Sequence, residues 1–359
     1  MHRLMLISFA FLLATQTSIA QSAIILGPEA EAAGLTVTQV ATNLDFPMGM
    51  TPLPDGSLLV ATNPSSDGVF YTSDGQLLRL FDSDGDGSLD QETPLAEDLP
   101  GGLVAVVRFG EIVAATSSEY GNEQIMFFRR GDRWRDPLTQ IDDIRINFIN
   151  SGHQSYGLAV RPNPDDPEQF DLFFNIGAAG NDTAGPDVQT SGAIDDVLTT
   201  ASVYMVTIRD TGDALTFSDA TLIATGLRNG TTMAIQPGTG DLWIGENGID
   251  GLDDPNISFS ADELNIVPAA QIGKDVIDFG FPDAYIDYAT GDPVGPETQF
   301  VAFLPTSDGK SEGVAGITFA PGSFPEPFAG GVLAGFHGRF DETGLTNTEN
   351  PLLWINPAT

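Results

Sequence analysis

Residues 233–248 read MAIQPGTGDLWIGENG: an apolar start, a proline, a turn of Gly and Asp, and an apolar run that closes in glycine. A similar order, with Gly or Asp in the turn, returns four times, once without the proline and twice without the closing glycine, in MGMTPLPDGSLLVAT (48–62), LVAVVRFGEIVAAT (103–116), YGLAVRPNPDDPEQFDLFFNIG (156–177) and GITFAPGSFPEPFAGGVLAGFHG (316–338). A turn of this kind between two apolar runs is typical of an antiparallel hairpin. The phrases start about 50 to 85 residues apart, which is the spacing of propeller blades with inserted loops. The sequence therefore predicts an all-β fold, a β-propeller, with two strands of one blade in each phrase.

The five phrases leave two interpretations of the blade number. The chain stops at NPLLWINPAT (350–359), shortly after the fifth phrase, so the ring has five blades or six with the last one incomplete. We favour six, because a final strand with an open edge is an aggregation liability. The segment LTVTQVATNLD (35–45) is expected to form an extra strand that closes the ring by pairing with the last blade. No linker stands out after residue 20, which predicts a single propeller domain over residues 21–359.

The composition is that of a globular protein with an acidic surface. Of the 359 residues, 41% are hydrophobic and 18% charged, which separates the chain from disordered sequences. A net charge of −36 repels phosphate backbones and lipid headgroups, so we expect no nucleic-acid partner and no peripheral membrane partner. The chain has no cysteine, which excludes disulfides, thiol nucleophiles and thiolate metal sites.

The amino terminus has the three parts of a signal peptide. His2 and Arg3 precede an apolar run from Leu4 to Ala14, and Ser18-Ile19-Ala20 offers a small-x-small cleavage site. The apolar run is too short for a lasting transmembrane helix. Residues 1–20 are therefore predicted to be removed, and the mature protein is expected to be secreted or periplasmic, without membrane insertion.

Two residues stand out as candidates for chemistry. Arg228 and Asn229, in GLRN, sit just before the inner strand of a blade, where propeller loops face the central channel and place ligands. A guanidinium suits carboxylates and oxyanions, so Arg228 is a candidate ligand-binding residue. The alternative is an ordinary salt bridge between Arg228 and one of the many acidic residues. His153, in GHQSYGLAV (152–160), opens a blade phrase from a loop and could act as a general base or as a simple capping residue.

A longer series of motifs then carries a resemblance. GLRN, a Pro-x-x-Gly-x-Leu-Trp turn, Glu-x-Gly, DELN (262–265) and FGFP (279–282) follow in this order. The series resembles the signature of the PQQ-dependent soluble sugar dehydrogenases, the glucose/sorbosone dehydrogenase family, and the likeness covers residues 46–339. The resemblance implies PQQ and Ca²⁺ as cofactors. The residues it assigns to PQQ are Arg228, Asn229, Asn247, His337 and Arg339, with Lys310 as a further cationic contact, and those whose stretch supplies carbonyls to Ca²⁺ are Gly248 and Ile249.

The same resemblance assigns the chemistry. His153 would remove the alcohol proton, hydride would pass to the quinone, and Arg228 would stabilise charge on the quinone oxygen. One departure weakens this assignment. In the glucose-oxidising branch the strand after the histidine ends in Gly-Asp, and that Asp orients the imidazole, whereas this chain has Ala178 there. Asp182, four residues later, is the candidate substitute; without a carboxylate the tautomer of the histidine would be less well fixed.

A separate calcium-type loop lies at residues 82–93. DSDGDGSLDQE (82–92) puts three aspartates at positions 1, 3 and 5 of such a loop, a glycine at 6, a carbonyl at 7 and an aspartate at 9. These predicted ligands are Asp82, Asp84, Asp86, Ser88 and Asp90. Position 12 is Thr93 rather than the usual Glu, so a solvated Asp-Gly turn is the alternative interpretation.

The sequence thus favours a secreted, quinoprotein-like oxidoreductase that oxidises a sugar or polyol hydroxyl and passes electrons to an external acceptor. The first alternative is a non-catalytic, calcium-stabilised extracellular propeller that binds glycans or acts as a scaffold. The second is a Ca²⁺-dependent, lactonase-like hydrolase, for which only Glu246 and Asn247 are attractive ligands.

Overall fold

The computed structural model describes residues 26–64, 74–118, 123–148, 153, 157–252, 259–296, 300–303, 313–336, 340–341, 344–345 and 352–357. Residues 1–20, assigned above to a signal peptide, lie outside this set, as do Lys310, His337 and Arg339. Within it, α1 (Pro28–Ala32) is the one helix, and no helix is long and apolar enough to cross a bilayer. The rest of the regular structure is strand, which confirms the all-β prediction.

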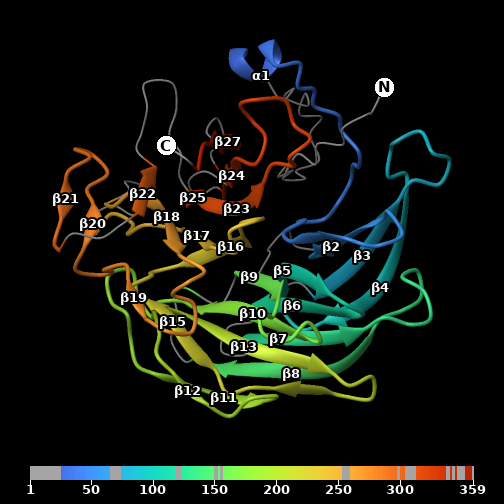
Figure 1. The fold of residues 1–359 in the computed structure, drawn as a ribbon, viewed down its shortest axis with the longest axis horizontal. Coiled ribbons are helices and arrows are strands. Elements are labelled where there is room, and N and C mark those ends of the chain that lie inside the picture. Colours follow the sequence, from blue (N-terminus) through green and yellow to red (C-terminus); the bar gives the residue numbers. More distant parts are fainter. Residues whose placement is uncertain are drawn as a thin grey trace.

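Five sheets, antiparallel except for the β15–β19 pair, form blades 1 to 5, numbered in the order of their first strands (Figure 1). Blade 1 contains β1 (Met50–Pro52), β2 (Leu58–Thr62), β3 (Gly75–Phe81) and β4 (Gln91–Leu99). Blade 2 contains β5 (Gly102–Phe109), β6 (Ile112–Ser118), β7 (Glu123–Arg129) and β8 (Thr139–Asn147), extended by β11 (Val188–Gly192) and β12 (Val197–Leu198). Blade 3 contains β9 (Leu158–Pro162), β10 (Gln169–Ile176), β13 (Ser202–Asp210), β14 (Leu215–Phe217), β15 (Thr221–Thr225) and β19 (Ile277–Asp278).

Blades 4 and 5 are the last two that the described residues form. Blade 4 contains β16 (Gly230–Ile235), β17 (Leu242–Glu246), β18 (Asp262–Val267) and β22 (Phe300–Phe303), and blade 5 contains β23 (Val314–Phe319), β24 (Val332–Phe336) and β27 (Leu352–Ile355). Two small hairpins stand apart: β20 (Tyr285–Ile286) with β21 (Pro293–Val294), and β25 (Phe340–Asp341) with β26 (Gly344–Leu345). The first strands β5, β9, β16 and β23 gather near the middle of the molecule in Figure 1, and β1 contacts β5.

Each of the five sequence phrases forms the first hairpin of one blade, as predicted. The hairpins are β1–β2, β5–β6, β9–β10, β16–β17 and β23–β24. The arrangement is a propeller of five blades, and a count of six with an incomplete last blade is compatible with it. Apolar cores fill the spaces between neighbouring sheets: Phe127 of blade 2 packs with Phe174 of blade 3, and Trp243 of blade 4 packs with Val314 of blade 5.

The expected closing strand at residues 35–45 was wrong. All of this segment is described, and none of it forms a strand. Leu35 packs beside Phe324 and Phe328 at blade 5, whereas Val40 packs at blade 1 and its carbonyl oxygen accepts a 2.7 Å hydrogen bond from Leu89. The segment therefore runs between the first and last blades and is held by side-chain packing rather than by a strand ladder.

Candidate functional site

One end of the propeller collects the residues that the sequence singled out. In every blade the first strand begins, and the second strand ends, at the same end of the sheet, because the two run antiparallel. His153 precedes β9, Ala178 follows β10, Arg228 precedes β16 and Asn247 follows β17. We call this end of blades 3 and 4 the site rim.

His153 is buried at this rim and hydrogen-bonded through its ring. Only 9% of the residue is exposed, and Nδ1 lies 3.2 Å from the carbonyl oxygen of Ala178. A carbonyl can only accept, so Nδ1 carries the proton and Nε2 is the basic nitrogen. Burial, and then the charge of Arg228, lower the pKa of His153 to about 3, while the hydrogen bond to Ala178 opposes this shift. The imidazole is therefore neutral, with its proton on Nδ1 and with Nε2 as the nitrogen left to accept a further proton.

The contact with Ala178 shows what orients the imidazole in place of the aspartate that the resemblance implies at this position. The side chain that the resemblance expected here, an aspartate, is missing, but the backbone carbonyl of the same residue holds Nδ1. Asp182 does not take part: it is exposed and accepts a hydrogen bond from the hydroxyl of Thr183. Gly177 makes the close approach possible, because a Cβ there would lie 2.3 Å from the carbonyl oxygen of His153.

Arg228 lies on the other side of Ala178. The N–H of Ala178 donates over 2.8 Å to the carbonyl oxygen of Arg228, so this one residue bonds to both candidates. The guanidinium is 3% exposed; Nε and Nη2 donate to the backbone and side-chain oxygens of Asn181, at 2.9 and 2.8 Å. Nη1 donates to the carbonyl oxygen of Asn247 at 3.3 Å, and Nη2 pairs with Asp250 at 2.6 Å. The structure thus brings His153 and Arg228 together, with Asn229 and Asn247 beside them.

Buried carboxylates lie next to Arg228, and of these the sequence had singled out only Glu246, as a ligand of the hydrolase alternative. Glu246 accepts hydrogen bonds from the backbone N–H of Arg228 and, at 2.8 Å, from the amide of Asn265. Asp262 accepts from the N–H groups of Gly248 and of Val314 in blade 5, each at 2.9 Å. Glu263 faces Glu246 as its cross-strand partner. The signal was the pair of adjacent acids that opens the buried strand DELNIV.

These carboxylates are poorly compensated. Burial raises the pKa of Glu246 to about 8 and that of Asp262 to about 6, and burial followed by the charge of Glu246 raises the pKa of Glu263 well above its usual value. Among the described residues, three buried side-chain amide oxygens have no hydrogen-bond donor: those of Asn229, Asn247 and Asn265. Carboxylate and amide oxygens are the ligands that Ca²⁺ prefers, so the chemistry of these oxygens fits this ion.

A narrow cavity opens onto the same residues. It is lined by Gly226, Arg228, Glu246, Gly248, Ile249, Ser260, Glu263, Phe279, Phe281, Ala284 and Tyr285. The predicted carbonyl ligand Ile249 lines it, but its carbonyl oxygen already accepts from the N–H groups of Phe259 at 2.8 Å and Ser260 at 3.1 Å. Its own N–H donates to the hydroxyl of Ser260 at 2.6 Å. The side-chain oxygens of this cavity are therefore better placed to take a cation than the Ile249 carbonyl.

The calcium-type loop lies in blade 1, between β3 and β4. Asp82, Asp84 and Asp86 each bring a carboxylate oxygen within 4.8 Å of the others. Backbone N–H groups of Gly87 and Gly85 donate to Asp82 at 2.8 and 2.6 Å and, being its strongest partners, help hold its pKa below the usual value. Both glycines have positive φ, +94° and +82°, as the sharp turn requires.

The other two predicted loop ligands are placed differently. Asp90 accepts from the N–H and hydroxyl of Ser83, at 3.0 and 2.9 Å, and lies outside the group of three carboxylates. Ser88 donates its N–H to Asp86 at 2.7 Å. The structure therefore brings together positions 1, 3 and 5 of the loop, and turns position 9 toward the backbone.

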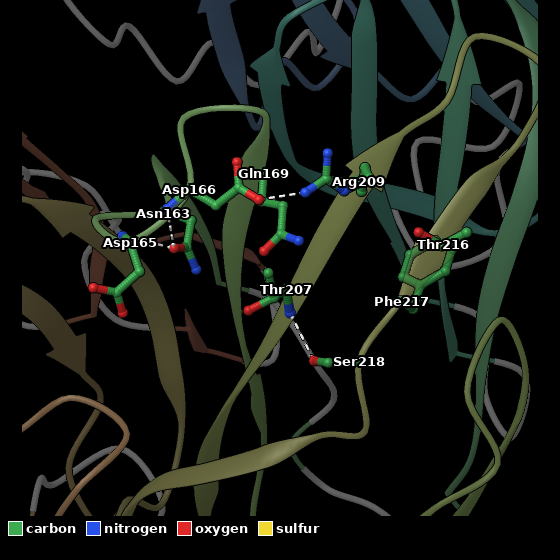
Figure 2. A pocket seen from close by; sticks show the side chains of 9 residues that line it. All are labelled: Asn163, Asp165, Asp166, Gln169, Thr207, Arg209, Thr216, Phe217 and Ser218. Atoms are coloured by element: carbon green, nitrogen blue, oxygen red, sulfur yellow. Dashed lines mark hydrogen bonds and ion pairs between the residues drawn. The ribbon is translucent and has the colours of Figure 1, made fainter.

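A second, open groove lies at the opposite end of blade 3, around the β9–β10 turn. Figure 2 shows the residues that line it: Asn163, Asp165, Asp166, Gln169, Thr207, Arg209, Thr216, Phe217 and Ser218. Its charged and polar groups bond mainly to one another, as Arg209 does with Asp166 and Glu168. This groove shares no residue with the site rim.

Comparisons with known proteins place the fold. No protein-family model matches the chain, and no curated protein matches it. Among solved structures, a glucose dehydrogenase superimposes with a TM-score of 0.54 at 17% identity, over 89% of each chain. The calcium structure of a Trichoderma reesei member of Carbohydrate-Active Enzymes Family AA12 gives 0.52 at 17% identity, over 89% of this chain and 85% of that one. The holo form of the pyranose dehydrogenase PQQ domain from Coprinopsis cinerea gives 0.51 at 15%, over 89% and 84%. The chain therefore has the propeller fold of these sugar dehydrogenases.

Proposed function

We propose that this protein is an oxidoreductase that uses PQQ and Ca²⁺ to dehydrogenate a hydroxyl group of a sugar or polyol, with an external electron acceptor. One observation carries the proposal. At the site rim, the neutral His153 donates its Nδ1 proton to the carbonyl oxygen of Ala178, and the N–H of the same alanine donates to the backbone of Arg228, whose guanidinium is buried. The fold shared with a glucose dehydrogenase and a PQQ domain supports it.

The base of the reaction would be Nε2 of His153. The tie to Ala178 fixes the proton on Nδ1, so Nε2 can accept the hydroxyl proton of a substrate as the C–H hydride leaves the same carbon. When bound, PQQ supplies the two-electron acceptor for that hydride. The substrate hydroxyl becomes a carbonyl, and the resulting imidazolium loses its proton to water.

Arg228 and Asn229 would hold the anionic cofactor. The guanidinium is the one charged cation among the described residues of the cavity, and it suits carboxylates and quinone oxygens. Asn247 would add a contact, and His337 and Arg339 would supply further contacts from the segment after β24. Ca²⁺ would take the oxygens of Glu246, Glu263 and the neighbouring amides, with the stretch that includes Gly248 and Ile249 alongside, and would offset the buried negative charge.

Two further parts of the proposal concern the chain as a whole. Residues 1–20 would act as a signal peptide and deliver the propeller outside the cytoplasm. The loop at residues 82–93 would bind a second, structural Ca²⁺ through Asp82, Asp84 and Asp86, with Ser88 and Asp90 as the remaining loop positions.

The test is reconstitution of the purified protein with PQQ and Ca²⁺, followed by dye reduction with a panel of aldoses and polyols. We expect sugar-dependent dye reduction in the wild type and a loss of at least about a hundredfold in His153→Asn, because general base catalysis contributes about 10²–10⁴-fold. The asparagine keeps an N–H donor for Ala178, so folding and cofactor binding serve as its internal control. Cofactor binding without any sugar-dependent turnover would contradict the enzyme assignment.

The second candidate is the non-catalytic, calcium-stabilised propeller. The observation that favours it is that each nitrogen of the Arg228 guanidinium already donates to the protein's own oxygens. This function predicts Ca²⁺-dependent stability with no PQQ binding, and glycan binding by calorimetry in the absence of any cofactor.

A further inference from the structure

The buried guanidinium of Arg228 is covered by an exposed carboxylate. Arg228 is 3% exposed and the side chain of Asp250 is 58% exposed, yet their atoms approach to 2.6 Å. Asp250 belongs to the loop that follows β17, while Asn181 belongs to the loop that follows β10. The pair therefore lies at the surface of the site rim, with the carboxylate on the solvent side and the cation beneath it.

Asn181 holds the backbone of Asp250 in place. The N–H of Asp250 donates to the side-chain oxygen of Asn181 at 2.9 Å, and the amide of Asn181 donates to the carbonyl oxygen of Asp250, also at 2.9 Å. These two bonds involve no carboxylate oxygen of Asp250. A rotation of the Asp250 side chain alone would therefore release Arg228 and leave both loops where they are.

The guanidinium would stay ordered after such a rotation. Its Nε and Nη1 bonds, to Asn181 and Asn247, do not depend on Asp250. A buried cation left without its counter-ion is costly, so the carboxylate should leave only as another anion arrives. The charges of Glu246 and Asp262 also act on Arg228, but the described hydrogen bonds of their carboxylates go to backbone N–H groups and to Asn265. Asp250 is therefore the carboxylate that bonds to the guanidinium.

We infer that Asp250 is a specificity-determining residue that occupies the anion position of the site, so that a ligand binds Arg228 by exchanging its own carboxylate or oxyanion for the Asp250 carboxylate. This inference rests on the proposed function in taking the anionic quinone as the ligand. It accounts for a ligand-binding arginine in which each guanidinium nitrogen already donates to an oxygen of the protein. We call the Asp250 carboxylate on Arg228 the plug. The inference also predicts selectivity between ligands, because an anionic ligand can displace the plug and a neutral ligand cannot.

The first experiment is a titration of PQQ, in the presence of Ca²⁺, into wild type, Asp250→Asn and Asp187→Asn, followed by fluorescence. Asp187 is exposed in the loop that carries Asn181 and is not among the partners of Arg228, so its substitution removes the same charge without the contact. We expect Asp250→Asn to bind about tenfold more tightly than wild type, because one charge-assisted hydrogen bond no longer competes, and Asp187→Asn to stay within about twofold. Equal or weaker binding by Asp250→Asn would overturn the inference.

A second measurement separates failure of this inference from failure of the proposed function. If no variant binds PQQ, the proposed function fails, and the plug is tested with sulfate as the probe. The Nε–H signal of Arg228, assigned by its loss in Arg228→Lys, should respond to sulfate in Asp250→Asn at a concentration about tenfold lower than in wild type. An identical sulfate response in both proteins would overturn the plug.

Discussion

Nδ1 of His153 lies 3.2 Å from the carbonyl oxygen of Ala178, and this contact sets the tautomer of the histidine. The N–H of the same alanine donates to the carbonyl oxygen of Arg228 at 2.8 Å. A single residue at the end of β10 thus positions the candidate base through its oxygen and the candidate cofactor ligand through its nitrogen. Because backbone atoms do both tasks, the identity of the side chain at position 178 matters little, provided that it is small.

The first prediction concerns the two residues at this strand end. Ala178→Ser should leave the Nδ1–H tautomer and sugar oxidation within about threefold of wild type, since the backbone contacts persist. Gly177→Ala should disrupt both, because its Cβ would lie 2.3 Å from the carbonyl oxygen of His153. The ¹⁵N shifts of the imidazole report the tautomer directly. Loss of the tautomer in Ala178→Ser, with Gly177→Ala unaffected, would refute the positioning role of the backbone.

The second prediction is that His153 does not titrate near neutrality. Its pKa is lowered to about 3, first by burial and then by Arg228, whereas an unfolded histidine titrates near 6.5. The stabilisation from the neutral ring is therefore complete above pH 6.5 and is lost as the pH falls from 6.5 toward 3, because only the unfolded state takes up the proton.

Urea unfolding of wild type and His153→Asn at pH 7 and pH 5 measures this linkage. Between these values the wild type should lose about 2 kcal/mol more than the variant, since one proton per molecule over about 1.5 pH units corresponds to that amount. Imidazole carbon-bound proton shifts should stay constant from pH 8 to pH 5. A titration midpoint near 6.5 would contradict the buried, Arg228-facing environment.

The third prediction concerns the buried carboxylate of Glu246. Glu246→Gln should change the free energy of unfolding by less than about 1 kcal/mol in the absence of Ca²⁺, because its carbonyl still accepts from Arg228 and the amide of Asn265 can turn its unpartnered oxygen toward the new N–H₂ group. Glu246→Ala should cost about 2–4 kcal/mol by leaving two buried donors without acceptors.

Calcium distinguishes the structural role of Glu246 from its proposed role as a ligand. Ca²⁺ should raise the melting temperature of wild type by more than that of Glu246→Gln, since the glutamine lacks the charge that a hard cation needs. An equal rise in both proteins would remove Glu246 from the proposed ligand set.

The fourth prediction addresses the loop in blade 1. Asp84→Asn removes one of three clustered carboxylates but keeps the hydrogen bonds that Asp82 accepts from Gly85 and Gly87. Calorimetric titration should therefore show one fewer Ca²⁺ bound in Asp84→Asn than in wild type, with PQQ binding unchanged. Asp98→Asn, at an exposed aspartate elsewhere in blade 1, is the matched control and should keep the wild-type stoichiometry. An unchanged stoichiometry in Asp84→Asn would mean that the loop is a solvated turn.

The sequence predicted the fold well because each blade repeats the same local chemistry. A turn with Gly or Asp between two apolar runs is enough to specify a hairpin, and all five phrases formed one. The prediction of a strand at residues 35–45 was wrong because its apolar side chains, such as Val40 and Leu44, pack half-buried against blade 1 without a partner strand. The apolar residues of this segment indicated that it packs against the propeller, but not that it does so through side chains alone, without strand pairing.

The site was only partly predictable, for a different physical reason. GLRN and GHQ pointed to the same rim because strand direction alone places their loops there. The carbonyl of Ala178 could not be found, since every residue has a backbone and none of it carries a sequence signal. The plug of Asp250 on Arg228 was equally hidden, because the two residues come together through Asn181, 47 positions before Arg228 along the chain. Asp262 and Glu263 did carry a signal, as adjacent acids at the start of a buried strand.

The most direct test of the account is a crystal structure of the protein soaked with PQQ and Ca²⁺. We expect the quinone at the rim of blades 3 and 4, with a cofactor oxygen within hydrogen-bonding distance of the Arg228 guanidinium and Nε2 of His153 facing the same cavity. A quinone bound elsewhere on the molecule, or an imidazole whose Nε2 faces away from it, would contradict the central claim.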